Sequence, residues 1–234
     1  MGTRIFVVLC GAIAGVALSA SAGERQGPAA KEFMGMPLQF AEDFESGAFE
    51  RWAPSDPKAW RVTQQGENRV LNQFQPSNVE TPVRSPFNRA VVKDIIVGDF
   101  VLDARVQSTT KDYPHRDVCL FFGYQDPAHM YYVHLGKQAD AHANSIFLVN
   151  GEPRVSIAET RTSGTDWDDD WHQVRVVRKV GEGTIAVFFD DMNEPVMTAV
   201  DKHFTWGRVG VGTFDDTGNF DDVRLWGIVA EPSK

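Results

Sequence analysis

Cysteine is scarce in this chain, which contains two among 234 residues. Cys10 lies in the amino-terminal apolar run, and Cys119 lies in the apolar stretch 118–122. If the amino-terminal run is removed on maturation, no intrachain disulfide is possible. The chain also has neither a CxxC nor an HExxH motif, so the sequence gives no support for a zinc site. We interpret Cys119 as a small buried hydrophobic residue rather than a nucleophile.

Positive charge is also limited. The chain has 23 Lys and Arg against 32 Asp and Glu, which gives a formal net charge of −9. Nucleic acids and anionic membranes attract basic surfaces, so this balance disfavours both as partners.

A hydrophobic run long enough to cross a membrane is missing. The apolar run 5–18 is short for a transmembrane helix, is preceded by Arg4, and is followed by the small residues Ala-Ser-Ala at 20–22. This order of features is typical of a cleaved signal peptide. We therefore predict a signal peptide at 1–22 and a secreted or periplasmic protein without membrane insertion.

Helical periodicity and internal repeats are absent as well. No stretch repeats its apolar residues with a sustained period of 3.6, and prolines punctuate 54–86. Residues 23–37 are small and polar, which predicts a flexible lead-in. We expect one domain at 38–229, because all-β sandwiches of this size are commonly single units, and a short tail at 230–234.

Strand signals are what the sequence does contain. From Asp99 onwards, short runs rich in β-branched and aromatic residues alternate with Gly, Asp and Asn turns. In the run 100–106 apolar residues alternate, and in 130–135 Tyr131, Val133 and Leu135 share one face while Met130, Tyr132 and His134 share the other. The Asn-Gly pair at 150–151 predicts a hairpin. This pattern predicts an all-β antiparallel sandwich or barrel.

Six of these runs also resemble the strands of a known superfamily in their order. The runs are FVLDARV (100–106), VCLFFGY (118–124), YYVHL (131–135), WHQVRV (171–176), IAVFFDD (185–191) and FDDVRL (220–225). They resemble the concanavalin A-like lectins and glucanases, and within them the laminin-G-like jelly rolls. The resemblance implies a two-sheet antiparallel jelly-roll β-sandwich. That superfamily contains lectins, adhesive modules, glycoside hydrolases and polysaccharide lyases, so the fold alone does not assign an activity.

Motifs for catalysis are not evident. The Glu-x-Asp-x-Glu run of the resembling glucanases is absent, and so are the motifs of the alginate-lyase-like jelly rolls. Glycan binding requires less: an aromatic platform with polar groups beside it. We therefore predict an exported glycan-binding module that uses the sheet face of Tyr132 and His134, assumed to be exposed. The other predicted contacts are Asn144, Arg154 and Trp167.

Two alternatives stay open. One is a polysaccharide lyase or glycoside-cleaving enzyme of the same fold, whose catalytic residues the sequence does not identify. The other is a protein-interaction domain. The sequence also does not indicate the oligomeric state or which glycan would bind.

Acidic residues gather at both ends of the predicted domain. Glu42 and Asp43 begin it, and Asp221 and Asp222 lie in its last strand. First and last strands often pair in such sandwiches, and closely placed carboxylates favour a cation. The resemblance to glucanases implies a calcium ligand at the position of Asp221. We therefore predict a structural Ca²⁺ ion with Asp43 and Asp221 as ligands.

Overall fold

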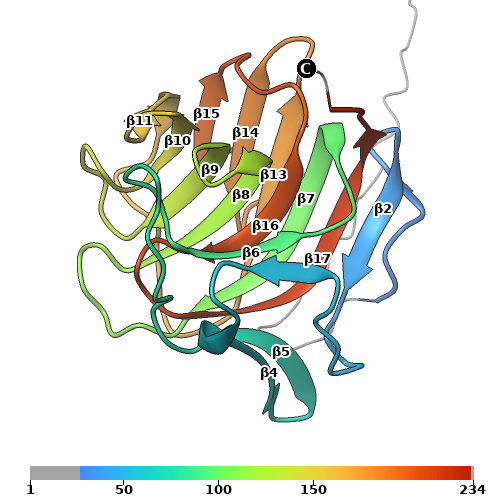
Figure 1. The fold of residues 1–234 in the computed structure, drawn as a ribbon, viewed down its shortest axis with the longest axis vertical. Coiled ribbons are helices and arrows are strands. Elements are labelled where there is room, and N and C mark those ends of the chain that lie inside the picture. The colour runs from blue at the N-terminus through green and yellow to red at the C-terminus, as the bar shows by residue number, and fades with distance from the viewer. Residues whose placement is uncertain (1–26, 233–234) are drawn as a thin grey trace, which may run out of the picture.

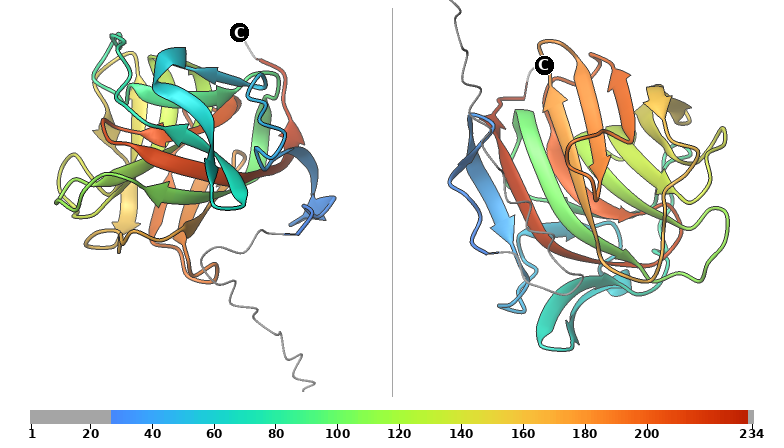
Figure 2. Two further views of the ribbon diagram at one scale, coloured as in Figure 1. Left: turned by 90° about the horizontal axis from the view of Figure 1, so that it is seen from below. Right: turned by 180° about the vertical axis from the view of Figure 1, so that it is seen from behind.

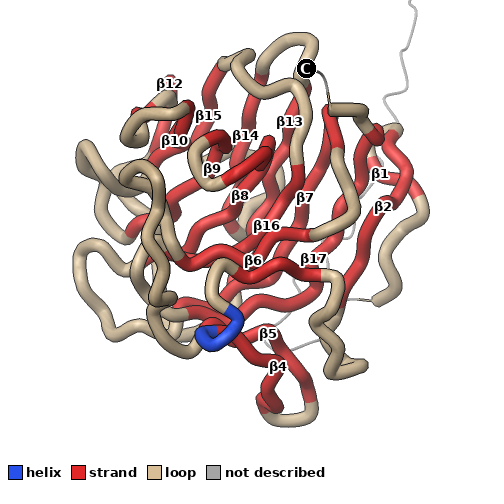
Figure 3. The backbone as a smooth tube through the Cα atoms, viewed as in Figure 1, coloured by secondary structure: helices blue, strands red, loops and turns tan. Residues whose placement is uncertain are grey.

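The computed structural model describes residues 27–232 and is an antiparallel β-sandwich (Figures 1 and 3). The described residues contain one short 3₁₀ turn, at Pro57–Ala59, and none of their helices is long and apolar enough to span a membrane. The predicted signal peptide lies outside the described residues. The predicted sandwich of two antiparallel sheets is confirmed.

The larger sheet has ten strands. Eight follow the order β1-β2-β17-β7-β13-β14-β15-β12, and β5 pairs with both β17 and β4. Their bounds are β1 (Glu32–Phe33), β2 (Met36–Glu42), β4 (Trp60–Gln65), β5 (Asn68–Gln73), β7 (Val97–Ser108), β12 (Ala158–Arg161), β13 (His172–Lys179), β14 (Thr184–Phe189), β15 (Met197–Val200) and β17 (Gly218–Val229). Figure 2 shows blue β2 beside red β17, so the first long strand pairs with the last strand, as predicted.

The smaller sheet has seven strands in the order β11-β10-β9-β8-β16-β6-β3. Their bounds are β3 (Trp52–Pro54), β6 (Asn88–Val92), β8 (Asp117–Asp126), β9 (His129–Gly136), β10 (Ser145–Asn150), β11 (Val155–Ser156) and β16 (Arg208–Thr213). The hairpin predicted around 150–151 is β10–β11, in which Leu148 pairs with Val155.

The main core lies between the two sheets. The residues that alternation assigned to one face of 100–106 are buried there, and so are Tyr131, Val133 and Leu135. Period-2 alternation therefore predicted the inward face of β7 and of β9, because successive strand side chains point to opposite faces.

The strands begin earlier than the sequence indicated. The predicted lead-in 23–37 contains β1 and the start of β2. The indole nitrogen of Trp226 donates to the carbonyl of Ala30 over 2.7 Å, and the Phe33 ring packs on Trp226 at 5.2 Å. Contacts with the last strand hold this segment in place. The composition of 23–37 gives no sign of these contacts.

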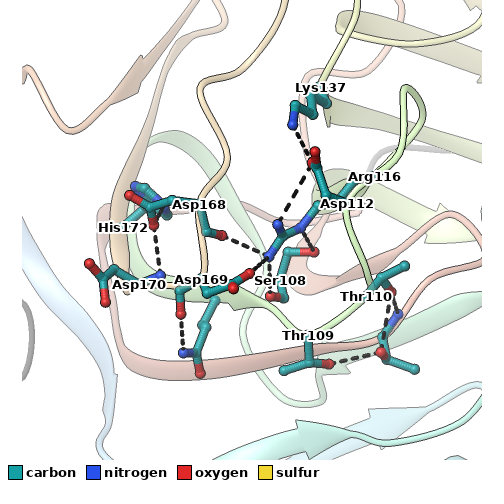
Figure 4. A network of polar contacts seen from close by, with 12 residues as sticks. Ser108, Thr109, Thr110, Asp112, Arg116, Lys137, Asp168, Asp169, Asp170 and His172 are labelled. Atoms are coloured by element: carbon teal, nitrogen blue, oxygen red, sulfur yellow. Dashed lines mark hydrogen bonds and ion pairs between the residues drawn. The ribbon is translucent and has the colours of Figure 1, made fainter.

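His172 at the start of β13 links two acidic loops. Its Nδ1 lies 2.8 Å from an oxygen of Asp190, and its Nε2 lies 3.1 Å from an oxygen of Asp168 (Figure 4 shows the second contact). Burial lowers the pKa of His172, but the bonds and charges of Asp190 and Asp168 outweigh burial and raise this pKa above its ordinary value of 6.5.

This raised pKa predicts a pH dependence of folding. The folded protein binds the His172 proton more tightly than the unfolded chain does. The contribution of His172 to stability is therefore fully present below pH 6.5 and is lost as the pH rises through the folded-state pKa. Urea unfolding from about pH 6 to about pH 8 should show the stability difference between wild type and His172→Gln shrinking as the pH rises. A difference that stays constant would contradict this prediction.

Candidate functional site

The outer face of the seven-stranded sheet is covered, contrary to the prediction that Tyr132 and His134 are exposed. Tyr132 is fully buried and His134 is 4% exposed. They lie in a second hydrophobic layer with side chains of β8, β9 and β10, against which pack Val83 of the β5–β6 segment and Phe214 of the β16–β17 turn. Alternation identified the correct face but could not show that other segments cover it.

Tyr132 and His134 pack against aromatic rings in this layer. The Tyr132 ring stacks on Phe147 at 5.1 Å, and the His134 ring stacks on Phe214 at 5.7 Å. Burial raises the pKa of Tyr132, whose hydroxyl has no hydrogen-bond partner. Burial also lowers the pKa of His134 to about 3, although its bond to the carbonyl of His142 opposes this shift. The imidazole of His134 is therefore neutral at physiological pH.

The other predicted contacts do not gather around Tyr132. Trp167 belongs to the core between the sheets, and its indole nitrogen donates to the carbonyl of Leu135 over 2.7 Å. Asn144 is fully buried, donates to the carbonyl of Thr162, and accepts from the hydroxyl of Thr165. These bonds hold the loop before β13 against β9 and β10. A glycan contact by either side chain stays a prediction.

Arg154 does reach the layer that contains Tyr132. Its guanidinium lies 4.3 Å from the ring centre of Phe214 and 5.5 Å from that of Phe147. Its Nη2 donates to the carbonyl of His142 at 3.4 Å, while its Nε and Nη1 are buried without partners. Arg154 therefore closes the end of the layer near His134.

A polar cluster lies beneath this cover. Asp117 and Cys119 of β8 meet His134 of β9, and all three side chains are buried. One Asp117 oxygen lies 3.2 Å from the Cys119 sulfur and 3.4 Å from His134 Nε2. Burial, with the nearby Asp216 charge, raises the pKa of Asp117, and burial with the Asp117 charge raises the pKa of Cys119.

The uncovered part of the same face forms a pocket. Its volume is about 350 Å³, and β3, β6, β8, β16 and the segment before β6 contribute to its walls. The lining residues are Ala53, Pro54, Ser55, Val79, Glu80, Arg89, Val91, Tyr124, Pro127 and Arg208. We refer to this pocket as the β3–β8 groove.

Tyr124 and two arginines are the main chemical groups of the β3–β8 groove. The guanidinium of Arg208 lies 5.5 Å from the centre of the Tyr124 ring. Arg89 is 5% exposed, and its Nη1 donates to the carbonyl of Pro86. Burial lowers the pKa of Arg89, and a hydrogen bond with Tyr124 opposes that shift. The groove thus presents a half-buried aromatic ring between two cationic side chains.

A β-bulge places Tyr124 in the groove. Strict alternation along β8 would put Tyr124 on the inner face with Leu120 and Phe122. The register shifts after Phe122, and Gly123 has a φ of 53°, so one extra residue turns Tyr124 outward. The site residues predicted from the sequence did not include Tyr124, Arg89 and Arg208. The signal available for Tyr124 was a glycine inside an apolar strand, which often marks a bulge.

The predicted calcium ligands are not brought together as a cage. Asp221 accepts from Asn68 at one oxygen and from the Asp222 amide at the other, and burial raises its pKa to about 6. Asp43 is exposed and accepts from the Glu45 amide. Among the described residues, no group of three potential metal ligands contains Asp43 or Asp221. These surroundings do not fit a calcium ion, which requires several free oxygens. A structural Ca²⁺ ion at Asp43 and Asp221 stays a prediction.

No protein-family model matches the chain, and no curated protein matches it in sequence. Solved structures do match. The carbohydrate-binding module CBM66 from Bacillus subtilis is 15% identical with a TM-score of 0.55, covering 76% of this chain and 96% of that one.

Two further structures give a similar result. Domain 4 of AbnA, a GH43 extracellular arabinanase from Geobacillus stearothermophilus in complex with arabinotriose, is 11% identical with a TM-score of 0.52, covering 83% of this chain and 94% of that one. The lectin UEA-II, complexed with galactose, is 13% identical with a TM-score of 0.52, covering 80% of this chain and 97% of that one. At such identities the likeness concerns the fold, which is a jelly roll of the concanavalin A-like type, as predicted.

Proposed function

We propose that this chain is an exported glycan-binding module whose binding surface is the β3–β8 groove. The observation that carries the proposal is the half-buried Tyr124 ring, set beside Arg208 and Arg89 in an open pocket of about 350 Å³. Sugars bind proteins by laying a C–H face on an aromatic ring and bonding their hydroxyls to nearby polar groups. Ser55 and Glu80 add such groups at the rim of the groove.

The similar structures support this proposal. They are a carbohydrate-binding module, an arabinanase domain in complex with arabinotriose, and a lectin complexed with galactose. Export is supported by the signal-peptide pattern at 1–22 and by the similar arabinanase, which is described as extracellular. The proposed site lies on the predicted sheet, but beside the buried Tyr132 and His134 rather than over them.

The groove also favours particular glycans. Guanidinium groups form charge-assisted hydrogen bonds with carboxylates. Arg208 and Arg89 in one pocket therefore favour sugars that carry a carboxylate, such as uronates, over neutral sugars. We expect this preference to weaken as salt is added, because salt screens exposed charges.

The test begins with a panel of neutral and uronate-containing polysaccharides, with retention on each measured for the mature protein. For a bound glycan, we expect Tyr124→Ala to lower the affinity at least about tenfold, as is usual for a central aromatic contact. Phe74→Ala is the matched control, because Phe74 is an exposed aromatic residue with Arg61 4.5 Å from its ring centre, outside the groove. It should bind as wild type does.

Other outcomes separate the alternatives. Equal binding by Tyr124→Ala and wild type would remove the groove from the proposal. The Tyr132→Phe variant deletes only an unpartnered hydroxyl. If this variant loses glycan binding, the binding site includes Tyr132, as the sequence predicted. Unsaturated uronate products would indicate a lyase, and new reducing ends a hydrolase. If no glycan is retained or cleaved, a protein-interaction domain becomes the leading interpretation.

A further inference from the structure

Three buried side chains with different ligand chemistry converge on the outer face of the seven-stranded sheet. They are Asp117 and Cys119 of β8 and His134 of β9, and their ligand atoms all lie within 4.8 Å of one another. We propose that these three residues bind one divalent transition-metal ion of the zinc type. This site is independent of the proposed glycan groove and of the predicted calcium site.

The spacing of the three atoms suits such an ion. An Asp117 oxygen is 3.2 Å from the Cys119 sulfur and 3.4 Å from His134 Nε2. Zinc bonds of about 2.0–2.3 Å in tetrahedral geometry separate neighbouring ligand atoms by roughly 3.3–3.6 Å. Two of the three separations are therefore close to those of a shared ion, and the Cys119 sulfur and His134 Nε2 lie within 4.8 Å of one another.

An unpartnered atom gives an independent reason to place a ligand here. His134 Nε2 is buried, has no hydrogen-bond partner and faces Asp117 Oδ2. His134 is 4% exposed, so bulk water does not solvate this atom. A buried polar atom without a partner costs about 1–3 kcal/mol, and a metal ion bound at this position would give His134 Nε2 a partner.

His134 is oriented as a metal ligand usually is. Its Nδ1 lies 3.0 Å from the carbonyl oxygen of His142, which can only accept a hydrogen bond, so Nδ1 carries the proton. A neutral imidazole then has its lone pair on Nε2, the atom that faces Asp117. A backbone carbonyl that holds the second nitrogen is a common support for a metal-bound histidine.

The charges of the ligand set suit a buried ion of charge 2+. A thiolate, a carboxylate and a neutral imidazole together carry two negative charges, so the complete site is neutral in a region of low dielectric. In the metal-free protein, the Cys119 thiol donates to Asp117. When the ion binds, this thiol proton, and any proton held by Asp117, passes to solvent as the sulfur–metal bond forms. Sulfur and nitrogen ligands favour zinc, cobalt or nickel over calcium and magnesium.

The site has a solvent edge at the β16–β17 turn. Asp117 forms a second group with Asp215 and Asp216, of which Asp215 is exposed. Both oxygens of Asp216 already accept hydrogen bonds, from the Tyr113 hydroxyl and from the Asp117 amide. Asp215 therefore marks the entry side. A water molecule that enters here would supply the fourth ligand, which keeps the complete site neutral. Metal binding would fasten this turn to β8 and β9.

The test uses the whole mature protein, purified with a reductant and treated with a chelator. Titration with Co²⁺ should give one ion per chain and a sulfur-to-cobalt charge-transfer band in the near ultraviolet, which only a bound thiolate produces. Zn²⁺ should displace Co²⁺ and raise the melting temperature, whereas Ca²⁺ should not displace Co²⁺. We expect Cys119→Ala to lose the band and to bind Co²⁺ at least about 100-fold more weakly.

The controls keep the proposal testable if a variant folds poorly. His134→Gln should weaken binding while keeping Cys119. His129→Gln removes an exposed imidazole that lies 2.9 Å from the Asp126 carboxylate, and it should bind Co²⁺ as wild type does. Absence of the band and of any stoichiometric Co²⁺ binding in the wild type would overturn the proposal. In that case the cluster is held by a proton shared among Asp117, Cys119 and His134.

Discussion

Replacement of Arg116 by alanine is expected to lower the free energy of unfolding by about 3–5 kcal/mol, because two carbonyl oxygens and the Ser108 hydroxyl lose their donor. The Arg116 side chain is 2% exposed, and its guanidinium donates to Ser108, to the Asp168 carbonyl and to the Asp169 carboxylate over 2.7–3.1 Å (Figure 4). Its removal leaves buried carbonyl oxygens without donors and releases the loop before β13 from the end of β7. The melting temperature should fall by roughly 6–20 °C.

Two variants serve as controls for Arg116. The Asp169 side chain is 96% exposed, so Asp169→Asn should cost no more than about 1 kcal/mol, although it removes the charge partner. Arg116→Lys should recover part of the loss, because lysine keeps the charge but not the planar set of donors. Urea unfolding of the three variants measures these stability costs. A loss below about 1 kcal/mol for Arg116→Ala would show that the loop is held by other contacts.

Replacement of Trp52 by alanine is expected to cost about 3–5 kcal/mol of stability. Trp52 of β3 is 1% exposed and lies between Phe40 and Phe44, with ring centres 5.5 and 5.8 Å away. Phe40 belongs to β2 of the other sheet, so Trp52 joins the two sheets at the edge that carries the β3–β8 groove. Its deletion leaves a cavity and weakens the position of β3. Glycan binding should therefore fall together with stability.

Trp52→Phe is the matched control. The indole nitrogen of Trp52 has no hydrogen-bond partner, so phenylalanine loses volume but no polar contact. We expect a smaller cost than for alanine, because the remaining ring fills most of the site and leaves a smaller cavity. If Trp52→Ala unfolds at the same urea concentration as Trp52→Phe, then the cross-sheet contact is not the source of stability at this edge.

Periodicity predicted the inner faces of the strands because it is a local property of the chain. Side chains alternate along every strand, so Tyr131 and Val133 had to share a face wherever β9 was placed. The β10–β11 hairpin followed from the Asn-Gly pair, whose backbone preference suits a tight turn. The pairing of β2 with β17 followed from the resemblance to other sandwiches rather than from these residues.

Periodicity could not predict what covers the outer face. Val83 and Phe214 come from segments distant in sequence, yet they lie over the face of Tyr132 and His134 and bury both. The same limit explains Trp167, which was expected at a binding surface and lies in the core between the sheets. Burial by a distant segment leaves no local pattern.

By itself, the sequence determined the all-β class and the inward residues of the regular strands, because turn chemistry and period-2 alternation act over a few residues. The two-sheet sandwich followed from the resemblance of six runs to a known superfamily. The tertiary structure alone decided the candidate sites. The bulge at Gly123 turned Tyr124 into the groove, and the pairing of β8 with β9 brought Cys119 opposite His134. These placements depend on strand register and on close packing between segments far apart in the chain, which no short stretch of sequence encodes.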